Sequence, residues 1–313
     1  MSNNPFPLVT IAIPTYNRAN SYLKYSLQSA TNQTYQNIEI IVSDNCSKDN
    51  TEEVVRNFND PRIIYFRQST NIGPNRNQNF CLEQAKGDYY LQLHDDDMID
   101  NDFVELCMKA VNYSTNIGII QTGVRVIDSE GNVMDETRNR MKGESIEEFF
   151  RGWFSAKTSW YLCNTLFNTQ KLKAIGGFPL SQTDDGIAIT KLVKFGRVDV
   201  EDVKASFRKH SEEITFAVKV KEWCEDYLYL LDQMCELIPD KNKVAFRNDG
   251  MRFFSMLNYN RARAVKSPFK QIIAYLTVYK KYHYFPSSYQ LPSEIAKMIP
   301  LLYKFKRIYK FIH

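Results

Sequence analysis

The sequence lacks the features of several common protein classes. Its six cysteines form no CxxC pair and its four histidines no paired spacing, so neither a zinc ribbon nor a redox motif is indicated. No stretch approaches the roughly 18 apolar residues that a membrane-spanning helix needs, and no basic segment followed by an apolar one opens the chain. We therefore expect a folded, cytoplasmic protein that is neither exported nor threaded through a membrane.

Charge is divided unevenly along the chain. The formal net charge is +4, but residues 241–313 contain 15 Lys and Arg against two acids, which leaves residues 1–240 with a net charge of −9. A basic terminal region points to an anionic partner, either a membrane surface or a nucleic acid. The length of 313 residues suits one catalytic domain followed by a smaller unit, with a soft boundary near residue 216.

Short apolar runs alternate with helical stretches over the first 120 residues. Strands are predicted at 8–13, 38–42, 63–66, 89–93 and 117–120, and helices at 21–33, from about 49, at 75–86 and at 102–112. This alternation predicts an α/β fold with a mostly parallel sheet flanked by helices. Beyond it we expect a hairpin over 123–135, helices at 146–154 and 187–195, and a helical region from about 222.

Polar residues follow each of the first four predicted strands. These segments are 15–18, 44–45, 71–73 and 94–97, and in a parallel sheet they line one ligand-binding edge. Three consecutive carboxylates, Asp95, Asp96 and Asp97, repel one another unless a cation neutralises them. A hard divalent ion with oxygen ligands would remove that cost. The alternative is a solvated acidic cluster that caps a helix.

The order of these motifs is similar to that of the family 2 glycosyltransferases, which have the GT-A fold. The matching segments are Pro14-Thr15-Tyr16-Asn17, Asp44-Asn45-Cys46-Ser47-Lys48-Asp49, Asn71-Ile72-Gly73, Gly87-Asp88-Tyr89 before the aspartates, Gly177-Phe178, Asp184-Asp185 and Phe207-Arg208-Lys209-His210. Each motif is weak alone, and their order over about residues 8–215 carries the resemblance. It implies a GT-A, Rossmann-like catalytic domain over 1–215 and a basic, aromatic-rich helical region over 216–313.

The resemblance also implies a site for a nucleotide-sugar donor. Its residues would be Pro14, Thr15, Asn17, Asp44 and Asn45 around the base, Arg76 and Asn77 near the diphosphate, and Asp95 and Asp96 in the metal motif. The family usually has Asp where Asn45 stands, and an amide oxygen still accepts the imide proton of uracil. Gln78-Asn79 stand where the family has Arg-Asn, and solvation on the helix surface is the alternative for Asn77.

A divalent metal ion and a catalytic base are implied as well. Mn²⁺ or Mg²⁺ is expected at Asp96, Asp97 and His210, where it would stabilise the departing diphosphate. Which aspartate of the triplet binds the ion and which the ribose stays open, and an exposed loop position is the alternative for His210. Asp185 matches the family's catalytic base, with Asp184 beside it, and a single base implies inversion. Helix capping is the alternative for this pair.

The end of the chain has the pattern of a basic amphipathic helix. Apolar residues recur on one helical face, flanked by Lys and Arg: Leu301, Leu302, Phe305, Ile308, Tyr309 and Ile312. Such a helix can lie on an anionic lipid surface, so contact with the inner face of the cell membrane is one expectation. The alternative is packing against its own catalytic domain or another subunit.

Together these patterns predict an inverting, metal-dependent glycosyltransferase. The expected donor is a nucleoside diphosphate sugar with UDP as the nucleotide, and the expected acceptor is a glycan or lipid-linked sugar of bacterial-type surface polysaccharide synthesis. Nucleic acid is not expected, because the acids of the crevice would oppose it. Two alternatives are a non-catalytic nucleotide-sugar binding protein and a nucleotidyltransferase, whose phosphate loop is typically glycine-rich, unlike Thr15-Tyr16-Asn17-Arg18.

Overall fold

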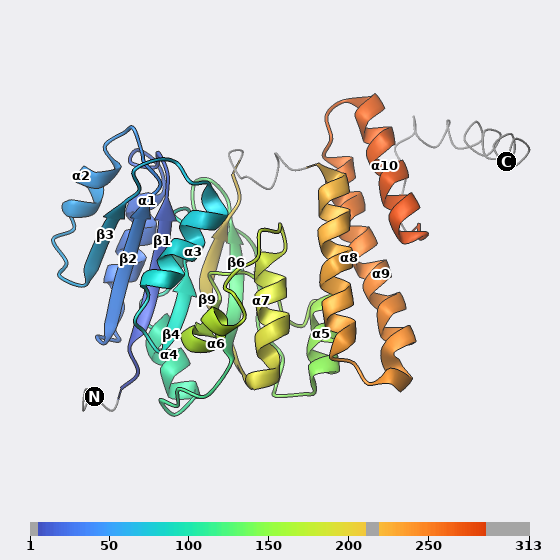
Figure 1. Ribbon diagram of the computed structural model, residues 1–313, viewed down its shortest axis with the longest axis horizontal. Helices are drawn as coiled ribbons and strands as arrows, with labels where there is room; N and C mark the ends of the chain where they lie inside the picture. The colour runs from blue at the N-terminus through green and yellow to red at the C-terminus, as the bar shows by residue number, and fades with distance from the viewer. Residues whose placement is uncertain (1–5, 211–218, 286–313) are drawn as a thin grey trace, which may run out of the picture.

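The computed structural model describes residues 6–210 and 219–285. Nine strands form one twisted sheet with helices on both faces, and three long helices stand beside it (Figure 1). The strands are β1 Val9–Thr15, β2 Ile38–Asp44, β3 Ile63–Arg67, β4 Tyr89–Gln92, β5 Met98–Ile99, β6 Ile119–Ile127, β7 Val133–Thr137, β8 Thr165–Asn168 and β9 Arg197–Arg208. The sheet order is β3-β2-β1-β4-β8-β6-β9-β5, with β7 paired to β6.

The first half of the sheet is parallel, as the strand and helix alternation predicts. β1 pairs with β2 and β4, and β2 pairs with β3, all in parallel. Every residue of β2 is buried, Glu39 included, which fits the apolar residues at 38 and 40–42. Their carboxyl ends therefore lie along one edge, where Thr15 is paired with Asp44.

The second half of the sheet is mixed. β8 is antiparallel to β4 and β6, whereas β6 and β9 are parallel. The predicted hairpin over 123–135 is confirmed as the β6–β7 pair. The sequence analysis missed β5, β8 and β9. The first two have only two and four residues, and β9 carries charged residues at several positions, so none has a simple apolar pattern.

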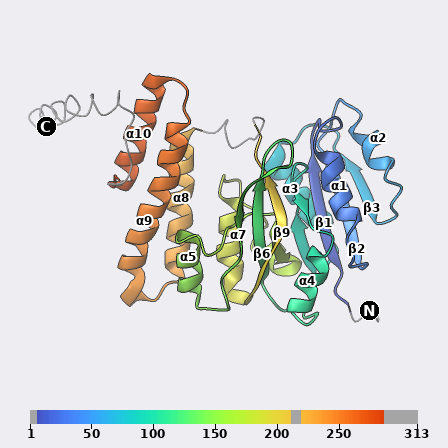
Figure 2. The same ribbon diagram turned by 180° about the vertical axis from the view of Figure 1, so that it is seen from behind.

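Helices cover both faces of the sheet (Figure 2). They are α1 Leu23–Thr31, α2 Thr51–Arg56, α3 Pro74–Gln84, α4 Phe103–Ala110, α5 Ile146–Phe154, α6 Thr169–Ala174 and α7 Asp184–Leu192, the last followed by a short 3₁₀ turn, Val193–Phe195. Side chains of α1 and α4 pack with Ile11 and Ile13 on one face, whereas α3, α6 and α7 share a core with Ala12 on the other. This division follows from the alternation of side chains along β1.

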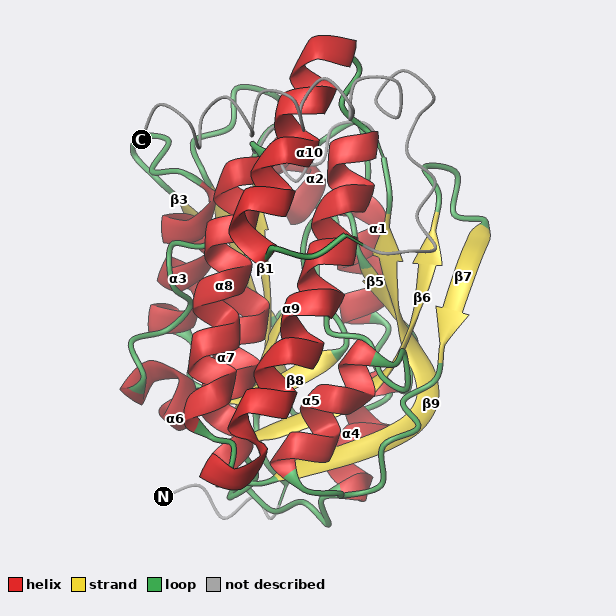
Figure 3. Cartoon of the chain, turned by 90° about the vertical axis from the view of Figure 1, so that its right-hand side faces the viewer, coloured by secondary structure: helices red, strands yellow, loops and turns green. Residues whose placement is uncertain are grey.

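Three helices follow the sheet: α8 Val220–Glu236, α9 Asp240–Arg263 and α10 Pro268–Tyr282. Figure 3 shows them as a layer in front of the sheet. α8 contacts α7, α9 contacts α5, and all three helices belong to the same hydrophobic cluster as α3 and α7. The predicted boundary near residue 216 falls between the described parts of the chain, and the division into two units stays a prediction.

Membrane-related features were also predicted from sequence. Within residues 6–210 and 219–285 no helix is both long and apolar enough to cross a membrane. The basic amphipathic helix predicted over 301–312 lies outside the described residues.

Candidate functional site

The aspartate triplet lies just past the carboxyl end of β4. Asp96 and Asp97 gather with His94, and one ligand atom from each of the three lies within 4.8 Å of the others, which is close enough for a shared cation. Asp95 turns toward Arg18 instead, with 3.9 Å between its carboxylate and the guanidinium Nε. The geometry therefore separates Asp95 from the other two acids, a distinction that the sequence left open.

Asp96 is the most readily ionised acid of the triplet. His210 Nε2 lies 2.9 Å from its Oδ2. Burial raises the pKa of Asp96, but the hydrogen bond with His210 and the charges of His94, His210 and Arg18 outweigh burial and leave it below its ordinary value. The predicted metal residues Asp96 and His210 are thus in direct contact, and Asp96 joins this pair to the cluster with His94 and Asp97.

Asp97 and Asp95 have the opposite tendency. Asp97 is 1% exposed, and its Oδ1 accepts the backbone N–H of Arg208 at 3.0 Å. Burial and the charge of Asp96 raise the pKa of Asp97 well above its ordinary value. The same two causes raise the pKa of Asp95 to about 6. Adjacent buried carboxylates therefore destabilise one another, and a divalent cation offsets this repulsion.

The second acidic cluster occupies the first turn of α7. This helix begins at Asp184, three residues before the predicted start, so Asp184 and Asp185 lie at its positive end. Gln78 Nε2 donates to Asp184 Oδ2 at 3.0 Å. Burial raises the pKa of Asp184, and the charge of His94 partly opposes it. Because His94 acts on both Asp96 and Asp184, the two acidic clusters lie at one site.

Asp185 is a half-buried carboxyl with a strongly altered proton affinity. Burial and the charge of Asp184 raise the pKa of Asp185 to about 7. Its Oδ1 also accepts the backbone N–H of Gly186 at 2.6 Å. A carboxyl that titrates near neutral pH can take a proton from a hydroxyl group and release it again, which suits a general base.

The residues predicted to surround the nucleotide base lie together at the ends of β1 and β2. Asn17 has φ 55° and its Oδ1 accepts the backbone N–H of Lys48, which ties the two loops together. Asp44 is 1% exposed, and its oxygens accept from the Ser47 N–H and the Tyr65 hydroxyl. Thr15 and Pro14 lie on β1 beside Asp44 and Ser43, respectively.

Asn45 joins this loop to the start of α3. Its Oδ1 accepts the N–H of Ile72 at 2.8 Å, and its Nδ2 donates to the side chain of Asn71 at 3.0 Å. The Asn45 amide oxygen, which was expected to accept a hydrogen bond from uracil, thus already accepts one from the Asn71-Ile72-Gly73 turn. Asn45 and Asp44 shape the loops of this edge in the structure, and their contact with a nucleotide stays a prediction.

The two predicted diphosphate residues lie on different faces of α3. Arg76 is exposed, but Asn77 is 2% exposed and is bonded twice to Ser43: its Oδ1 accepts from the hydroxyl at 2.6 Å and its Nδ2 donates to the carbonyl at 2.8 Å. Asn77 therefore fixes α3 to β2. Surface solvation, the alternative weighed for Asn77, does not apply.

We expect Asn77→Ala to lower the free energy of unfolding by about 1–3 kcal/mol, because it leaves the buried Ser43 groups without partners. Urea denaturation measures this loss. Arg76→Ala is the control from the same helix turn and should change stability by less than about 0.5 kcal/mol, since Arg76 is exposed. Unchanged stability in the Asn77 variant, with a weakened affinity for UDP, would instead assign Asn77 a direct role in donor binding.

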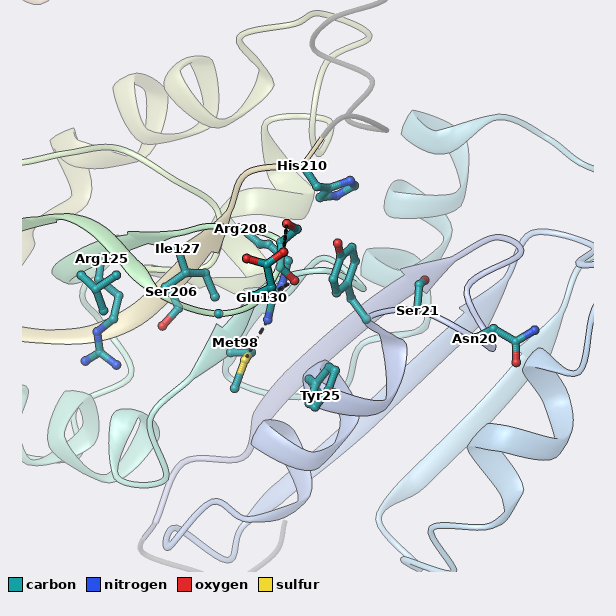
Figure 4. Close-up of a pocket in the computed structure, with 14 residues that line it drawn as sticks. Asn20, Ser21, Tyr25, Met98, Arg125, Ile127, Glu130, Ser206, Arg208 and His210 are labelled. Carbon is teal, nitrogen blue, oxygen red and sulfur yellow. Dashed lines mark hydrogen bonds between the residues drawn. The ribbon is translucent and has the colours of Figure 1, made fainter.

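A cavity of about 960 Å³ opens beside His210. Figure 4 shows Ser21 and Tyr25 on one side of it, Arg125 and Ile127 on the other, and His210 at one end. Its walls come from α1, the β6–β7 hairpin and β9, so it lies on the α1 face of the sheet. His210 lines this cavity and is also bonded to Asp96.

Several residues at the site were missed or given no role by the sequence analysis. Gln78 bonds to Asp184, and His94 lies in the cation cluster. Tyr161 packs against Phe207 in a tilted arrangement with 4.6 Å between ring centres and lies within electrostatic reach of both Asp185 and Asp97. His94 stood directly before the aspartates and was a detectable candidate, whereas the placement of Tyr161 depends on β8 and β9, which the pattern did not predict.

Comparison with known proteins gives the family. The sequence model described as Glycosyl transferase family 2 matches residues 10–176. An uncharacterized glycosyltransferase of Haemophilus influenzae is 39% identical over 130 residues, which cover 40% of this chain and 50% of that protein. The GalNAc(5)-diNAcBac-PP-undecaprenol beta-1,3-glucosyltransferase of Campylobacter jejuni is 36% identical over 147 residues, 45% of this chain and 44% of that protein. The chain thus spans about half the length of these relatives.

Solved structures with the same architecture confirm the predicted fold. Residues 1–349 of TarS of S. aureus in complex with UDP-GlcNAc have a TM-score of 0.71 at 17% identity, covering 88% of this chain and 80% of that one. A mannosyltransferase of Pyrobaculum calidifontis in complex with GDP-Man and Mn²⁺ has a TM-score of 0.56 at 17% identity, covering 97% and 82%. The chain therefore has the GT-A fold, with a mixed sheet and a helical C-terminal region.

Proposed function

The chain belongs to glycosyl transferase family 2, and we propose that it is an inverting, metal-dependent enzyme that moves a sugar from a UDP-sugar to a glycan or lipid-linked acceptor. One observation carries this proposal. A cation-type cluster of His94, Asp96 and Asp97 shares a site with Asp185, whose pKa is raised to about 7. Leaving-group stabilisation and proton removal from the acceptor require these two kinds of group in one cleft.

The donor set suits a divalent ion. One imidazole nitrogen and two carboxylates are ligands that Mn²⁺ accepts. The two carboxylates repel each other, and a bound cation would offset this repulsion. Such an ion would neutralise charge on the diphosphate as it leaves. His210 is hydrogen-bonded to the Asp96 carboxylate, and this bond helps to keep the pKa of Asp96 low. Asp95, paired with Arg18, remains for a hydroxyl of the donor.

Asp185 is the base in this proposal. Its half-buried carboxylate takes the proton of the acceptor hydroxyl as that oxygen attacks the anomeric carbon of the donor. Asp184 is held by Gln78, and its charge helps to raise the pKa of Asp185. In this proposal Asp184 does not contact the hydroxyl. One base facing the leaving group gives a single displacement, and the anomeric configuration inverts.

The choice of substrates is supported by the similar proteins. UDP-GlcNAc is bound by the structurally similar TarS, and GDP-Man with Mn²⁺ by the mannosyltransferase. The Campylobacter relative is named for transfer to a polyprenyl diphosphate-linked glycan. We infer a role in assembling a surface polysaccharide from a cytoplasmic nucleotide-sugar pool.

Membrane contact is part of this proposal, since a lipid-linked acceptor is presented at the bilayer surface. The described part of the C-terminal region contributes an exposed apolar stripe on α10, with Phe269 72%, Ile273 48% and Leu276 41% exposed. Lys270 and Lys280 lie on the same helix and would favour an anionic surface.

Thermal shift with a panel of nucleotide sugars tests the donor and the ion together. We expect a UDP-sugar to raise the melting temperature by several degrees at about 100 times its Kd, because ligand binding to the folded state then stabilises it by roughly 2.7 kcal/mol. This shift should need Mn²⁺ or Mg²⁺. A larger shift with GDP-Man would correct the nucleotide, and equal shifts with EDTA would contradict the metal requirement.

A further inference from the structure

The last turn of α9 holds a guanidinium group between two aromatic rings of α8. Arg261 lies with its guanidinium carbon 3.9 Å from the centre of the Trp223 ring and 5.2 Å from that of Tyr227. Its Nη2 also donates to the Tyr227 hydroxyl at 3.1 Å. Trp223 and Tyr227 are themselves stacked and nearly fully buried, 6% and 7% exposed. Two rings and one hydrogen bond therefore fix the cation in one orientation.

Packing of α8 on α7 brings this arginine to the catalytic edge. Trp223, Tyr227 and Leu230 follow helical spacing on one buried face of α8. Leu230 packs against Gly186, where a Cβ would lie only 2.7 Å from Leu230 Cδ2. The N–H of Gln182 donates to Asp226 at 2.7 Å, which fastens the loop before α7 to the same helix.

The start of α7 and the last turn of α9 both lie beside α8. In Figure 1 the first turn of α8 and the last turn of α9 lie toward the upper end of the molecule, and α7 begins lower, beside the middle of α8, where Leu230 packs against Gly186. The charge of Arg261 acts on Asp185 and partly offsets the effect of burial on its pKa. Arg261 thus lies within electrostatic reach of Asp185, although the two residues are 76 positions apart in the chain.

The guanidinium has no acidic partner within the described residues. Three other partly buried arginines are paired with carboxylates: Arg62 with Asp60, Arg125 with Asp100 and Arg197 with Asp199. No carboxylate of residues 6–210 or 219–285 lies within ion-pair distance of Arg261, and its Nε is buried without a hydrogen-bond partner. The indole N–H of Trp223 is likewise buried and unpaired. A half-buried cation with unused donors is costly unless a ligand anion completes it.

We propose that Arg261, held between Trp223 and Tyr227, binds an oxyanion of the acceptor, so that the acceptor carries a phosphate or carboxylate group next to the hydroxyl that is glycosylated. This inference rests on the proposed function, because it takes Asp185 to mark where that hydroxyl lies. A guanidinium recognises either oxyanion through two parallel N–H donors. The cavity beside His210 is not involved, since α1 and α9 lie on opposite faces of the sheet.

Calorimetry with the full chain saturated by UDP and Mn²⁺ tests the proposal, because the donor site is then filled. The probes are methyl glucoside, methyl glucuronide and methyl glucoside 6-phosphate. We expect wild type to bind at least one anionic probe about tenfold more tightly than the neutral one, as charge-assisted hydrogen bonds are roughly twice as strong as neutral ones. The better anionic probe tells carboxylate from phosphate acceptors.

Three variants locate the preference. Arg261→Gln should bring the ratio of anionic to neutral affinity to about one, and Arg261→Lys should keep part of it. Arg263→Gln removes the same charge from the same turn of α9, where Arg263 is exposed, and should keep all of it. A ratio within one sample does not depend on the fraction of folded protein, so partial unfolding cannot imitate the result.

Each outcome decides a claim. The inference is overturned if wild type shows no preference for an anionic probe, or if the preference survives in Arg261→Gln. The proposed function stays intact in either case as long as UDP and Mn²⁺ still bind. An equal loss in Arg263→Gln also overturns it, since the effect would then be general surface charge. Failure of UDP and Mn²⁺ to bind at all overturns the proposed function and this inference with it.

Discussion

Asp185→Asn is expected to lower kcat by about 10³-fold or more, because the amide cannot accept the proton of the attacking hydroxyl and general bases contribute typically 10²–10⁴-fold. Affinity for the UDP-sugar should change little, since Asp185 lies on α7, whereas the predicted nucleotide contacts lie at the ends of β1 and β2. Steady-state transfer assays and calorimetry with the donor measure the two quantities separately.

Asp184→Asn is the matched control for this prediction. The side chain is the adjacent carboxyl of the same length, but it is engaged with Gln78 and the backbone N–H of Asp185. We expect a smaller loss, on the order of tenfold. Full turnover in Asp185→Asn would point to a different base or to a non-catalytic nucleotide-sugar binding protein, and a larger loss in Asp184→Asn would exchange the two roles.

The pH dependence follows from the raised pKa of Asp185, about 7. Transfer by wild type should increase as pH rises through about 7, because only the ionised carboxylate is a base, and Asp185→Asn should lack this increase.

The stability of the fold should also depend on pH through Asp185. Its folded-state pKa lies above the unfolded value, so the stabilisation from proton binding is complete below about pH 4 and lost as pH rises to 7. Without metal at pH 8, the free energy of unfolding of Asp185→Asn should therefore exceed that of wild type by roughly 1 kcal/mol or more. At pH 4 this difference should vanish, and urea denaturation at the two pH values measures it.

The parallel half of the fold could be predicted because its strands are buried on both faces. β1 and β2 are rich in apolar, β-branched residues, and the polar residues that end them mark the ligand edge. β9 could not be predicted in the same way. Its twelve residues alternate irregularly between buried and exposed, and they are held by pairing with β6 rather than by an apolar pattern.

The acidic residues of the site were predictable, but their division of labour was not. Three adjacent aspartates have no distinguishable roles in a sequence. The structure separates them because Arg18 approaches Asp95 and His210 approaches Asp96. For Asn77 the sequence predicted a diphosphate contact, but in the structure this polar residue joins α3 to β2. Arg261 could not be connected with Asp185 at all, because its electrostatic effect on Asp185 depends on α8 packing against Gly186.

Asp96→Asn is expected to weaken Mn²⁺ binding by about a hundredfold or more. Asp96 is the acid of the triplet whose pKa is lowered, and it belongs to the cluster with His94 and Asp97. Outer partners of metal ligands already cost 10–100-fold when removed, so loss of a ligand should cost at least as much. The paramagnetic resonance signal of free Mn²⁺ measures the affinity without reference to turnover.

Asp95→Asn is the control that makes this prediction specific. It removes the same charge one residue away, but Asp95 faces Arg18 rather than the cluster. We expect its Mn²⁺ affinity to remain within about tenfold of wild type, because the lost charge acts only at a distance. The reverse order of the two variants would place the ion on Asp95. Equal and large losses would mean that the ion is held by the summed charge of the triplet, and the separation made by Arg18 and His210 would then have no bearing on metal binding.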